Sequence, residues 1–358
     1  MTSSSTTFSA PAGSVAKVSI IDTGTRCSAM PVSIFLSPPW DGFDHLNDIP
    51  SLSFLIESPA GKKLLFDLGF PADLGSLPPA PSQMWGSLGI DMKVGKDVSQ
   101  VLVEQGILLR DVGAVVWSHH HSDHIGDIRT FPKTTDVVVG PGFTKAFLPG
   151  YPNNPNAELH ESYFNGRNLL EIDFSEPDRS LEIGPFRAFD FFGDGSFYLL
   201  DTPGHDHGHL AGLARTTSSP DTFIFMAGDL CHHSGELRPS PYLPLPETRA
   251  DKPAAAASGL TPCIFSLRLL QDKQVARGRK AGEPFFNPGL FVDFEQAVRT
   301  IEHTQLPDAA DNVFVVMAHD AKLLQGKGKV EFFPAQANDW REKGWKRDNT
   351  WKFLGDLM

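Results

Sequence analysis

Cysteine is scarce in this chain of 358 residues, and long basic runs are absent from it. The three cysteines, Cys27, Cys231 and Cys263, are an odd number at wide spacing. This usage suits free thiols in a reducing compartment better than a framework of disulfide bonds. The formal net charge is -12, and without a Lys/Arg block we expect no binding to the phosphate backbone of a nucleic acid.

Long apolar runs are missing as well. No window approaches the roughly 18 uninterrupted apolar residues of a membrane span. The N-terminal sequence MTSSSTTFSAPAGS has neither the apolar core of a signal peptide nor the Arg-rich face of a transit peptide. We therefore expect a soluble, cytoplasmic protein with no membrane partner and with a disordered N-terminal tail over residues 1–14.

The chain does have enough apolar sequence for a large core. Hydrophobic residues make up 41% of it and aromatic residues 10%, which allows one elaborated domain or two. Apolar runs bounded by turn residues predict strands, and those at 51–58 and 62–69 form a hairpin closed at PAG. The other predicted strands are 15–22, 114–118, 136–140, 184–192, 196–202, 209–216, 222–229 and 312–320.

Helical patterns lie between some of these strands. Asp97 can cap a short helix that Gly106 ends. Apolar side chains at helical spacing, beginning with Phe291 and Phe294, predict a helix over 291–305. The number of strands suggests two packed sheets, and we expect the helices to cover them.

The segment at 239–288 differs in composition from the rest of the chain. It is rich in proline at first and then contains a basic patch, KQVARGRK. We interpret it as an insertion that lies beside the core, either as a lid or as a packing arm.

Four of the 13 histidines fall in one stretch, WSHHHSDHIGD, at residues 117–127. Residues two apart on an extended segment point the same way, so His119 and His121 can present their imidazoles to one point. If a helix begins directly afterwards, Asp123 and His124 offer an oxygen and a nitrogen to a second point close by. Imidazole and carboxylate suit zinc, or failing that iron or manganese. For any single histidine, a surface turn or a hydrogen-bonded core position is the competing interpretation.

Three further strand-like runs end in a side chain of the metal-ligand type. DTPGHDHGH follows a strand and breaks it with Pro-Gly directly before His205, FMAG precedes Asp229, and VFVVMA precedes His319. A core residue would lie within its strand, whereas loops beyond strand ends are where functional side chains gather. The pattern therefore predicts one site built from loops that are distant in the sequence.

Taken in order, these residues resemble the ligand pattern of the metallo-β-lactamase superfamily, which is HxHxDH followed by a distant His, a bridging Asp and a final His. The resemblance also covers FDLG, where Asp67 matches the early aspartate that steadies the histidine loop. It implies an α/β (α+β) fold, a four-layer αββα sandwich of two mixed β-sheets with helices on the outer faces, over residues 15–358. All seven ligand positions are present: His119, His121, Asp123, His124, His205, Asp229 and His319.

The resemblance also implies how the ligands are shared between two divalent ions, with zinc as the first candidate. One ion would be held by His119, His121 and His205, the other by Asp123, His124 and His319, and Asp229 would bridge them.

Not every histidine near the site receives a metal role. In the superfamily's TPGHxxGH form the first histidine binds metal and the second packs behind it, so we assign His209 to the position behind His205. His207 is expected to be exposed to solvent. His120 is expected to point away from the site and to bond elsewhere.

Such a site predicts hydrolysis. Two divalent ions can share a water whose pKa falls to about 7, and the resulting metal-bound hydroxide would attack a carbonyl or phosphoryl centre. Asp123, Asp229 and His232 are the candidate catalytic residues. The similar acyl-homoserine lactone lactonases carry a Tyr three residues after the bridging Asp, whereas this chain has His232. Its imidazole would stabilise the oxygen or donate a proton, or it is only a loop histidine.

The substrate is inferred by exclusion and by resemblance. Nuclease branches of the superfamily need a basic groove and an added domain, and the sequence shows neither. Secreted β-lactamases need an export signal, which the sequence does not show either. The segments SFLIESPAGKKLLFDLG, GPGF and FGDGSFYLLDTPGH resemble the sequences of intracellular fungal members of the superfamily. Some of these proteins open cyclic esters or cyclic amides of toxins. We therefore expect hydrolysis of a small lactone or lactam, such as a toxin or plant defence compound. Trp40 and Phe43 would line the pocket and favour a flat ring, or else pack their loop down.

Three other functions stay open. A thioesterase of the glyoxalase II type has the same seven ligands, and KQVARGRK could supply its cationic site. A mononuclear iron sulfur dioxygenase is less favoured because a full second ligand set is present, and a non-enzymatic scaffold would not need Asp229. The expected partner is a small molecule, and the sequence does not indicate an oligomeric state.

Overall fold

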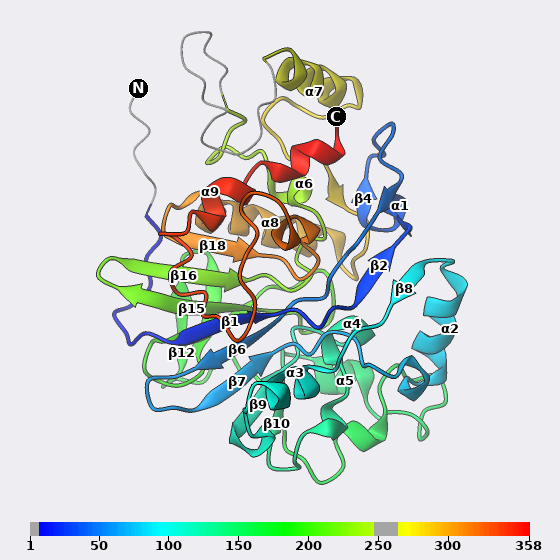
Figure 1. Ribbon diagram of the computed structural model, residues 1–358, viewed down its shortest axis with the longest axis vertical. Coiled ribbons are helices and arrows are strands. Elements are labelled where there is room, and N and C mark those ends of the chain that lie inside the picture. The colour runs from blue at the N-terminus through cyan, green and yellow to red at the C-terminus, as the bar shows by residue number, and fades with distance from the viewer. Residues whose placement is uncertain (1–6, 247–263) are drawn as a thin grey trace.

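Two large β-sheets form the centre of the molecule (Figure 1). The computed structural model describes residues 7–246 and 264–358. Within these residues each large sheet has six strands, ordered β1-β6-β7-β9-β10-β11 and β12-β13-β14-β15-β16-β18. The first comprises β1 (Lys17–Ile21), β6 (Ser53–Glu57), β7 (Lys63–Phe66), β9 (Val112–Val116), β10 (Asp136–Val139) and β11 (Leu169–Glu171). The second comprises β12 (Ser180–Ile183), β13 (Phe186–Asp190), β14 (Phe197–Asp201), β15 (Leu210–Ser218), β16 (Asp221–Met226) and β18 (Val313–Val316).

Side chains alternate between the two faces of each sheet. In β6, Phe54 and Ile56 enter the core between the sheets, while Leu55 joins the cluster on the outer face. In β14, Leu199 enters that central core and Leu200 faces outward. Because the side-chain period of a strand is two, a fully apolar strand serves both faces, which explains why these runs are hydrophobic throughout.

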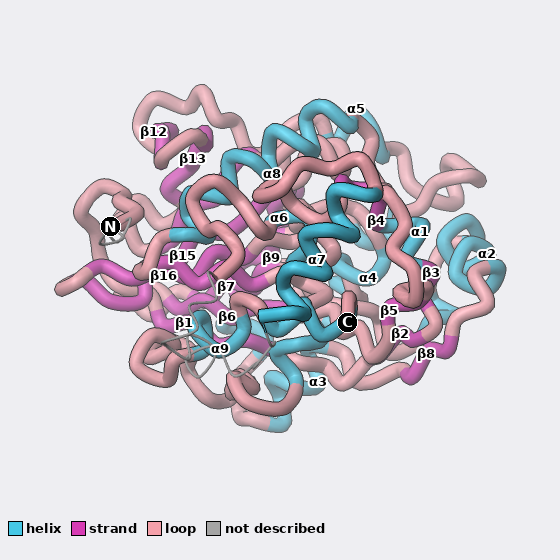
Figure 2. Tube along the Cα trace, turned by 90° about the horizontal axis from the view of Figure 1, so that it is seen from above, coloured by secondary structure: helices cyan, strands magenta, loops and turns pink. Residues whose placement is uncertain are grey.

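Helices cover the two outer faces. Leu102 of α3 (Val98–Glu104) packs on the first sheet, and Ile301 of α8 (Phe294–Ala309) packs on the second. Figure 2 shows α8 and α3 on opposite sides of the strands. The four-layer αββα sandwich and the predicted hairpin of β6 and β7 are therefore confirmed. The other α-helices of the described residues are α1 (Val32–Phe35), α2 (Pro79–Ser87), α4 (Ser122–Ile125), α5 (Phe143–Phe147), α6 (Ser234–Leu237), α7 (Ile264–Ala276) and α9 (Trp345–Asn349).

The helix predicted over 291–305 begins later than expected. Asp293 caps it by accepting a hydrogen bond from the Gln296 N–H, so Phe291 lies ahead of the helix. Phe291 and Phe294 are 38% and 41% exposed, and the buried side is formed by smaller residues such as Thr304. The apolar spacing was misleading because these two phenylalanines stack on each other at the surface.

The predicted disorder of the tail at 1–14 is wrong for residues 7–14, while residues 1–6 lie outside the described part. Phe8 is buried against Phe223, and its backbone N–H donates to the Asn312 side chain. The Asn312 amide donates back to the Phe8 carbonyl. This pair of hydrogen bonds anchors the segment to the edge of the second sheet, which a polar composition does not reveal.

The described part of the predicted insertion packs onto two distant segments. Leu267 and Leu270 of α7 share one apolar cluster with Trp40 and with Leu357 near the C-terminus. Figure 1 shows α7 beside the C-terminal end of the chain. Three small strand pairs lie outside the large sheets: β2 (Arg26–Ser28) with β8 (Asp91–Lys93), β3 (Met30–Pro31) with β5 (His45–Leu46), and β4 (Leu36–Ser37) with β17 (Asn287–Pro288). No helix formed by the described residues is long and apolar enough to cross a bilayer.

Strand direction brings the loops of interest to one edge. In the first sheet β7 and β9 are parallel. In the second, β14 and β16 are each antiparallel to β15, and β16 is parallel to β18. The carboxyl ends of β14, β16 and β18 therefore lie on the same side of their sheet, where the next residues can meet.

Candidate metal centre

Imidazole and carboxylate side chains from four strand ends converge at this edge. His119 and His121 follow β9, and the short helix α4 comes directly after them with Asp123 and His124. The remaining residues follow strands of the second sheet, and they are His205 after β14, Asp229 after β16 and His319 after β18. The structure thus brings together all seven residues that the sequence singled out, in two groups.

The first group consists of three imidazole nitrogens and one carboxylate oxygen. His119 Nε2 lies 2.8 Å from His121 Nδ1, and His205 Nε2 lies 3.2 Å from each of those two atoms. Asp229 Oδ2 is 3.8 Å from His119 Nε2 and 3.7 Å from His205 Nε2. Four possible donor atoms thus surround one point.

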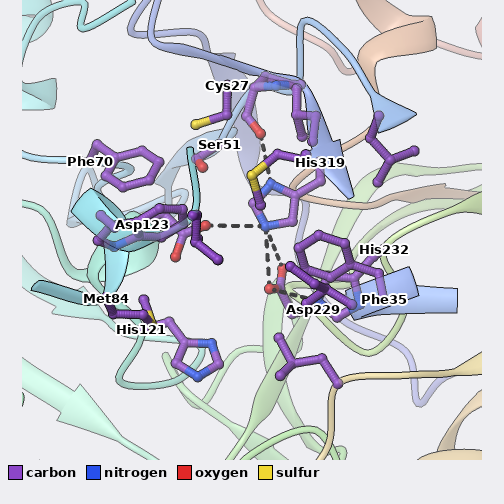
Figure 3. Close-up of a pocket in the computed structure, with 18 residues that line it drawn as sticks. Cys27, Phe35, Ser51, Phe70, Met84, His121, Asp123, Asp229, His232 and His319 are labelled. Carbon is purple, nitrogen blue, oxygen red and sulfur yellow. Dashed lines mark hydrogen bonds and ion pairs between the residues drawn. The ribbon is translucent and has the colours of Figure 1, made fainter. Parts of the chain in front are cut away.

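The second group lies on the other side of the same carboxylate. His124 Nε2 and His319 Nε2 are 3.4 Å apart, and Asp123 Oδ2 is 3.8 Å and 3.4 Å from them. Asp229 Oδ1 lies 3.2 Å from His124 Nε2 and 3.1 Å from His319 Nε2. The Asp229 carboxylate thus lies between the two groups. Both of its oxygens are close to His319 Nε2, at 3.1 Å and 3.2 Å (Figure 3), and Oδ2 also faces the first group.

These spacings fit a tetrahedral metal site. With zinc–nitrogen bonds of about 2.0 to 2.1 Å, ligand atoms at the corners of a tetrahedron are about 3.3 Å apart. The separations given above lie between 2.8 and 3.8 Å. Asp229 Oδ1, which is buried, has no hydrogen-bond partner among the described residues. A cation would satisfy it.

In three of the five imidazole rings, a hydrogen bond from Nδ1–H to a carbonyl or carboxylate oxygen on the far side of the ring turns Nε2 toward the two groups. His205 Nδ1–H donates to the Leu290 carbonyl at 3.2 Å, and His319 Nδ1–H donates to the Pro50 carbonyl at 2.7 Å. Asp67 Oδ2 accepts from His124 Nδ1–H at 2.9 Å. A proton on Nδ1 leaves the Nε2 lone pair free, so these partners select the tautomer that a metal requires.

Asp67 and His209 also hold the loops themselves. Asp67 accepts from the Ser118 N–H at 2.7 Å and from the Ser118 hydroxyl at 2.8 Å. His209 Nδ1–H donates to the Thr202 carbonyl at 3.0 Å, and its Nε2 accepts from the Asp229 N–H at 3.1 Å. Both side chains are buried behind the cage and do not belong to either donor group.

The first group is electrostatically prepared for a cation. Burial lowers the pKa of His119 and of His205 well below the ordinary histidine value, and burial lowers the pKa of His121 to about 4. The three imidazoles are therefore neutral near pH 7. Neutral imidazole is the form that binds metals.

The second group carries more negative charge. Burial opposes the charged form of His124 and His319, but Asp229 and Asp123 outweigh it and raise the pKa of both histidines. Burial also opposes the charge on Asp229, and His124 and His319 nevertheless hold its pKa well below the ordinary value. Positive charge is thus favoured at this point, as protons or as a metal ion.

His232 lies against the cage without belonging to it. Its Nε2 is 3.2 Å from Asp229 Oδ2, but neither ring nitrogen makes a hydrogen bond with a described residue. The ring packs on Phe35 at a centroid distance of 4.7 Å and is only 3% exposed. A buried imidazole without hydrogen-bond partners is costly, so packing alone does not explain a histidine at this position.

Comparison with known proteins identifies the family. Residues 46–216 match the family model described as the metallo-beta-lactamase superfamily. Gamma-lactamase FDB1 of Fusarium pseudograminearum (strain CS3096) is 41% identical over 349 residues, which cover 96% of this chain and 83% of that protein. Metallo-hydrolase mfmC of Annulohypoxylon moriforme is 42% identical over 347 residues, which cover 95% and 87%. The chain belongs to the metallo-β-lactamase superfamily.

A solved structure shows the same fold. AiiA of B. thuringiensis, with N-decanoyl-L-homoserine bound at its active site, has a TM-score of 0.55 and 18% identity, and the match covers 90% of this chain and 99% of that one. The protein is a metallo-hydrolase of this superfamily, related to gamma-lactamases and lactonases. The superfamily's fold binds metal ions, in keeping with the two His/Asp groups.

An apolar cavity of about 150 Å³ opens directly onto this superfamily site (Figure 3). His121, Asp123, Asp229, His232 and His319 form its polar end. The rest of its wall consists of Cys27, Met30, Ile34, Phe35, Leu46, Ile49, Pro50, Ser51, Phe70, Met84, Trp85, Leu88 and Leu290. No lysine or arginine is present among these lining residues.

Trp40 and Phe43, which the sequence placed at the pocket, do not line this cavity. The indole of Trp40 is buried against Phe285, and its Nε1–H donates to the Leu357 carbonyl at 3.2 Å. Phe43 packs on His233 and lines a second cavity that His232 and His319 also border. Packing is therefore the interpretation that the contacts of Trp40 support, and the pocket role of Phe43 stays a prediction.

The basic patch KQVARGRK also lies away from the cavity. The Arg277 guanidinium lies 4.6 Å from the ring centroid of Trp40 and 5.1 Å from that of Phe286. Arg279 donates to the Asn287 side chain at 2.7 Å. Arg277 thus holds the insertion to the loop around Trp40, whereas Arg279 bonds within the insertion, so these contacts of the two cations lie away from the His/Asp groups.

Sequence reasoning missed most of the cavity wall and one polar network. Phe35 and Phe70 belong to short apolar runs, which cannot be told from core by composition. His120 does turn away from the cage, toward Asp206 and Glu158. Burial opposes its charge, but Asp206 and Glu158 raise the pKa of His120 to about 9. Asp206 stands next to a predicted ligand, and only that position could have suggested it.

Proposed function

We propose that this protein is a dinuclear hydrolase that opens a small cyclic amide or cyclic ester, with a γ-lactam as the first candidate. The observation that carries the proposal is the position of Asp229, whose carboxylate lies between two sets of imidazole nitrogens. A carboxylate in that position is suited to bridging two ions. The 41% identity to a protein named as a gamma-lactamase supports a ring amide as the substrate class.

In this proposal two ligand sets share one carboxylate. The residues that would hold the ions are His119, His121 and His205 for one, Asp123, His124 and His319 for the other, and Asp229 for both. The donor set suits zinc, with iron and manganese as alternatives. When bound, such a pair of ions lowers the pKa of a shared water and polarises a carbonyl oxygen.

The protein's own side chains then orient the reaction. Asp229 and Asp123 accept hydrogen bonds from the attacking water and aim it at the carbonyl carbon. As the water oxygen bonds to that carbon, the ring bond from the carbon to nitrogen or oxygen breaks, and the proton that the water loses ends on the leaving atom. We assign to His232 a hydrogen bond to this leaving atom or to the oxygen that gains charge, because both its ring nitrogens lack a partner among the described residues.

The cavity favours an uncharged, apolar substrate. Its wall beyond the ligand end is almost entirely aliphatic, aromatic and sulfur-bearing, with no cation to pair with a carboxylate or phosphate. Burying an unpaired anion there would be costly. Cys27 and Cys231 are free and buried, and we propose the cytoplasm as the compartment because it keeps thiols reduced.

A substrate panel on metal-analysed protein tests the proposal. The panel contains neutral γ-lactams and γ-lactones, the same rings bearing a carboxylate, and glutathione thioesters. We expect turnover of the neutral rings, at least tenfold lower kcat/KM for the carboxylated ones, and no thioester hydrolysis. Turnover of the thioesters alone would contradict the proposal.

A further inference from the structure

The residue between the two inward-facing histidines of the first group forms its own network behind the cage. His120 Nδ1–H donates to Asp206 Oδ2 at 2.5 Å, and the His120 backbone N–H donates to the same oxygen at 3.3 Å. Asp206 directly follows His205. Each partner is therefore adjacent in sequence to a residue of the first donor group.

Both partners are built into the structure. His120 is 6% exposed and Asp206 is 3% exposed. The second oxygen of Asp206 accepts from the His207 N–H at 2.7 Å, which fixes the carboxylate within its own loop. The His120 ring stacks on Phe147 at 3.9 Å, and Glu158 Oε2 lies 3.2 Å from its Nε2 at the outer edge.

The two loops come from different sheets. The loop with His119 and His121 follows β9 of the first sheet, and the loop with His205 follows β14 of the second. Strands of different sheets share no backbone ladder, so ladder hydrogen bonds do not fix the spacing of these loops. A backbone hydrogen bond from Leu210 N–H to the Ser118 carbonyl, at 2.8 Å, joins them at one end. The His120–Asp206 pair joins them at the other.

A metal site is sensitive to that spacing, since ligand distances need to hold within about 0.2 Å. His205 Nε2 lies 3.2 Å from both His119 Nε2 and His121 Nδ1, across the gap between the loops. A relative shift of the loops would change these two separations. If the His205 loop is the one that shifts, the second group, Asp123, His124 and His319, keeps its own separations, because none of its members lies on that loop.

We propose that His120 and Asp206 are positioning residues that hold the two loops in register and thereby set the affinity of the His119/His121/His205 site in particular. The inference rests on the proposed pair of metal ions. It assigns a role to two side chains that contact neither ion nor substrate.

The test is a chelator competition that resolves the affinities of both ions in wild-type protein and in variants. Asp206→Asn removes the charged acceptor. His120→Phe keeps a ring to stack on Phe147 but has no N–H. We expect each variant to bind the ion of the His119/His121/His205 site roughly 10-fold to 100-fold more weakly, as for other residues that orient metal ligands. The affinity for the other ion should change by less than 2-fold. His120→Asn retains a side-chain N–H near the Nδ1 position and is expected to restore most of the affinity.

Glu158→Gln is the matched control, because Glu158 contacts the same ring from its half-exposed outer side. We expect both ions to bind it as in the wild type. Wild-type affinities in Asp206→Asn and His120→Phe would overturn the inference, and so would equal loss of both ions. If Asp206→Asn does not fold, His120→Phe carries the same comparison. A wild-type protein without bound ions would overturn the proposed function instead.

Discussion

At the scale of single residues, His232 is the side chain whose role most needs chemistry to explain it. It is buried, packs on Phe35, and has no hydrogen-bond partner among the residues described. A core position would be filled at lower cost by an apolar ring. His232 lies at the end of the apolar cavity, beside Asp229. In our proposal its ring forms a hydrogen bond only when a substrate is bound.

Replacing His232 by Phe should therefore separate binding from turnover. Phe fills the same space against Phe35 but offers no N–H to the reacting atoms. We expect kcat to fall by roughly 100-fold, the usual effect of losing one such donor, while both ions stay bound. His232→Gln, which keeps an N–H, should recover part of the rate. Steady-state kinetics with metal analysis provide the measurement, and a wild-type rate for His232→Phe would remove it from the mechanism.

Asp67 permits a second test at this scale. It lies at φ +60, a conformation that asparagine also adopts well, so Asp67→Asn should leave the backbone intact. The asparagine amide has one acceptor oxygen where the carboxylate has two, so at least one of the hydrogen bonds from Ser118 or His124 is lost. We expect a loss of about 10-fold to 100-fold in the affinity of the ion at the second group. Isothermal titration with zinc would measure it, and unchanged affinity would contradict a role for Asp67.

The ligand residues were predictable because their types and spacing carry the chemistry. It is unusual for two histidines to follow one apolar strand while single His or Asp residues follow three other apolar strands. This pattern can be recognised without a structure. Trp40 and Phe43 show the limit. An aromatic residue on an irregular loop can face a cavity or fill a gap, and only the position of α7 decides between them. Asp206 likewise becomes meaningful only when the loop from the other sheet is in place.

At the scale of elements, the described part of the predicted insertion packs on the loop around Trp40. Arg277 of the segment after α7 lies between the rings of Trp40 and Phe286, and its guanidinium also donates to the carbonyls of Pro38 and Pro39. Strand β17 then pairs with β4, and Leu290, two residues after the end of β17, forms part of the cavity wall. The arm thus supports the wall from outside the sandwich.

Arg277→Ala should measure that support. We expect a loss of about 1 to 2 kcal/mol in the free energy of unfolding, from the lost stacking on two rings and the lost hydrogen bonds. Lys273→Ala is the matched control on the same arm, because the Lys273 ammonium lies farther from Trp40, at 5.6 Å. It should cost less than half as much. Urea unfolding compares the two, and equal losses would show that Arg277 has no special role.

Strand positions were predicted well, and helix limits less so. A buried strand in this fold is apolar on both faces, so its run is visible in the sequence. The start of α8 was misjudged because Phe291 and Phe294 have helical spacing but stack on each other at the surface. Local spacing does not indicate whether an aromatic pair faces the core or solvent.

At the scale of the whole molecule, each sheet supplies part of the site. The first sheet contributes the HHHSDH loop and Asp67, and the second contributes His205, Asp229 and His319. The central core fixes the two sheets against each other, and the side chains behind the cage refine that alignment. Phe8 and Asn312 anchor the N-terminal segment to the second sheet.

The number of metal ions per chain is the most direct test of a carboxylate shared between two ions, and elemental analysis after dialysis against a slight excess of zinc measures it. We expect two ions in the wild type, at most one in Asp229→Ala together with loss of turnover, and two in Asp311→Ala, an exposed aspartate ahead of β18. Two ions in Asp229→Ala with unchanged activity would contradict a shared carboxylate.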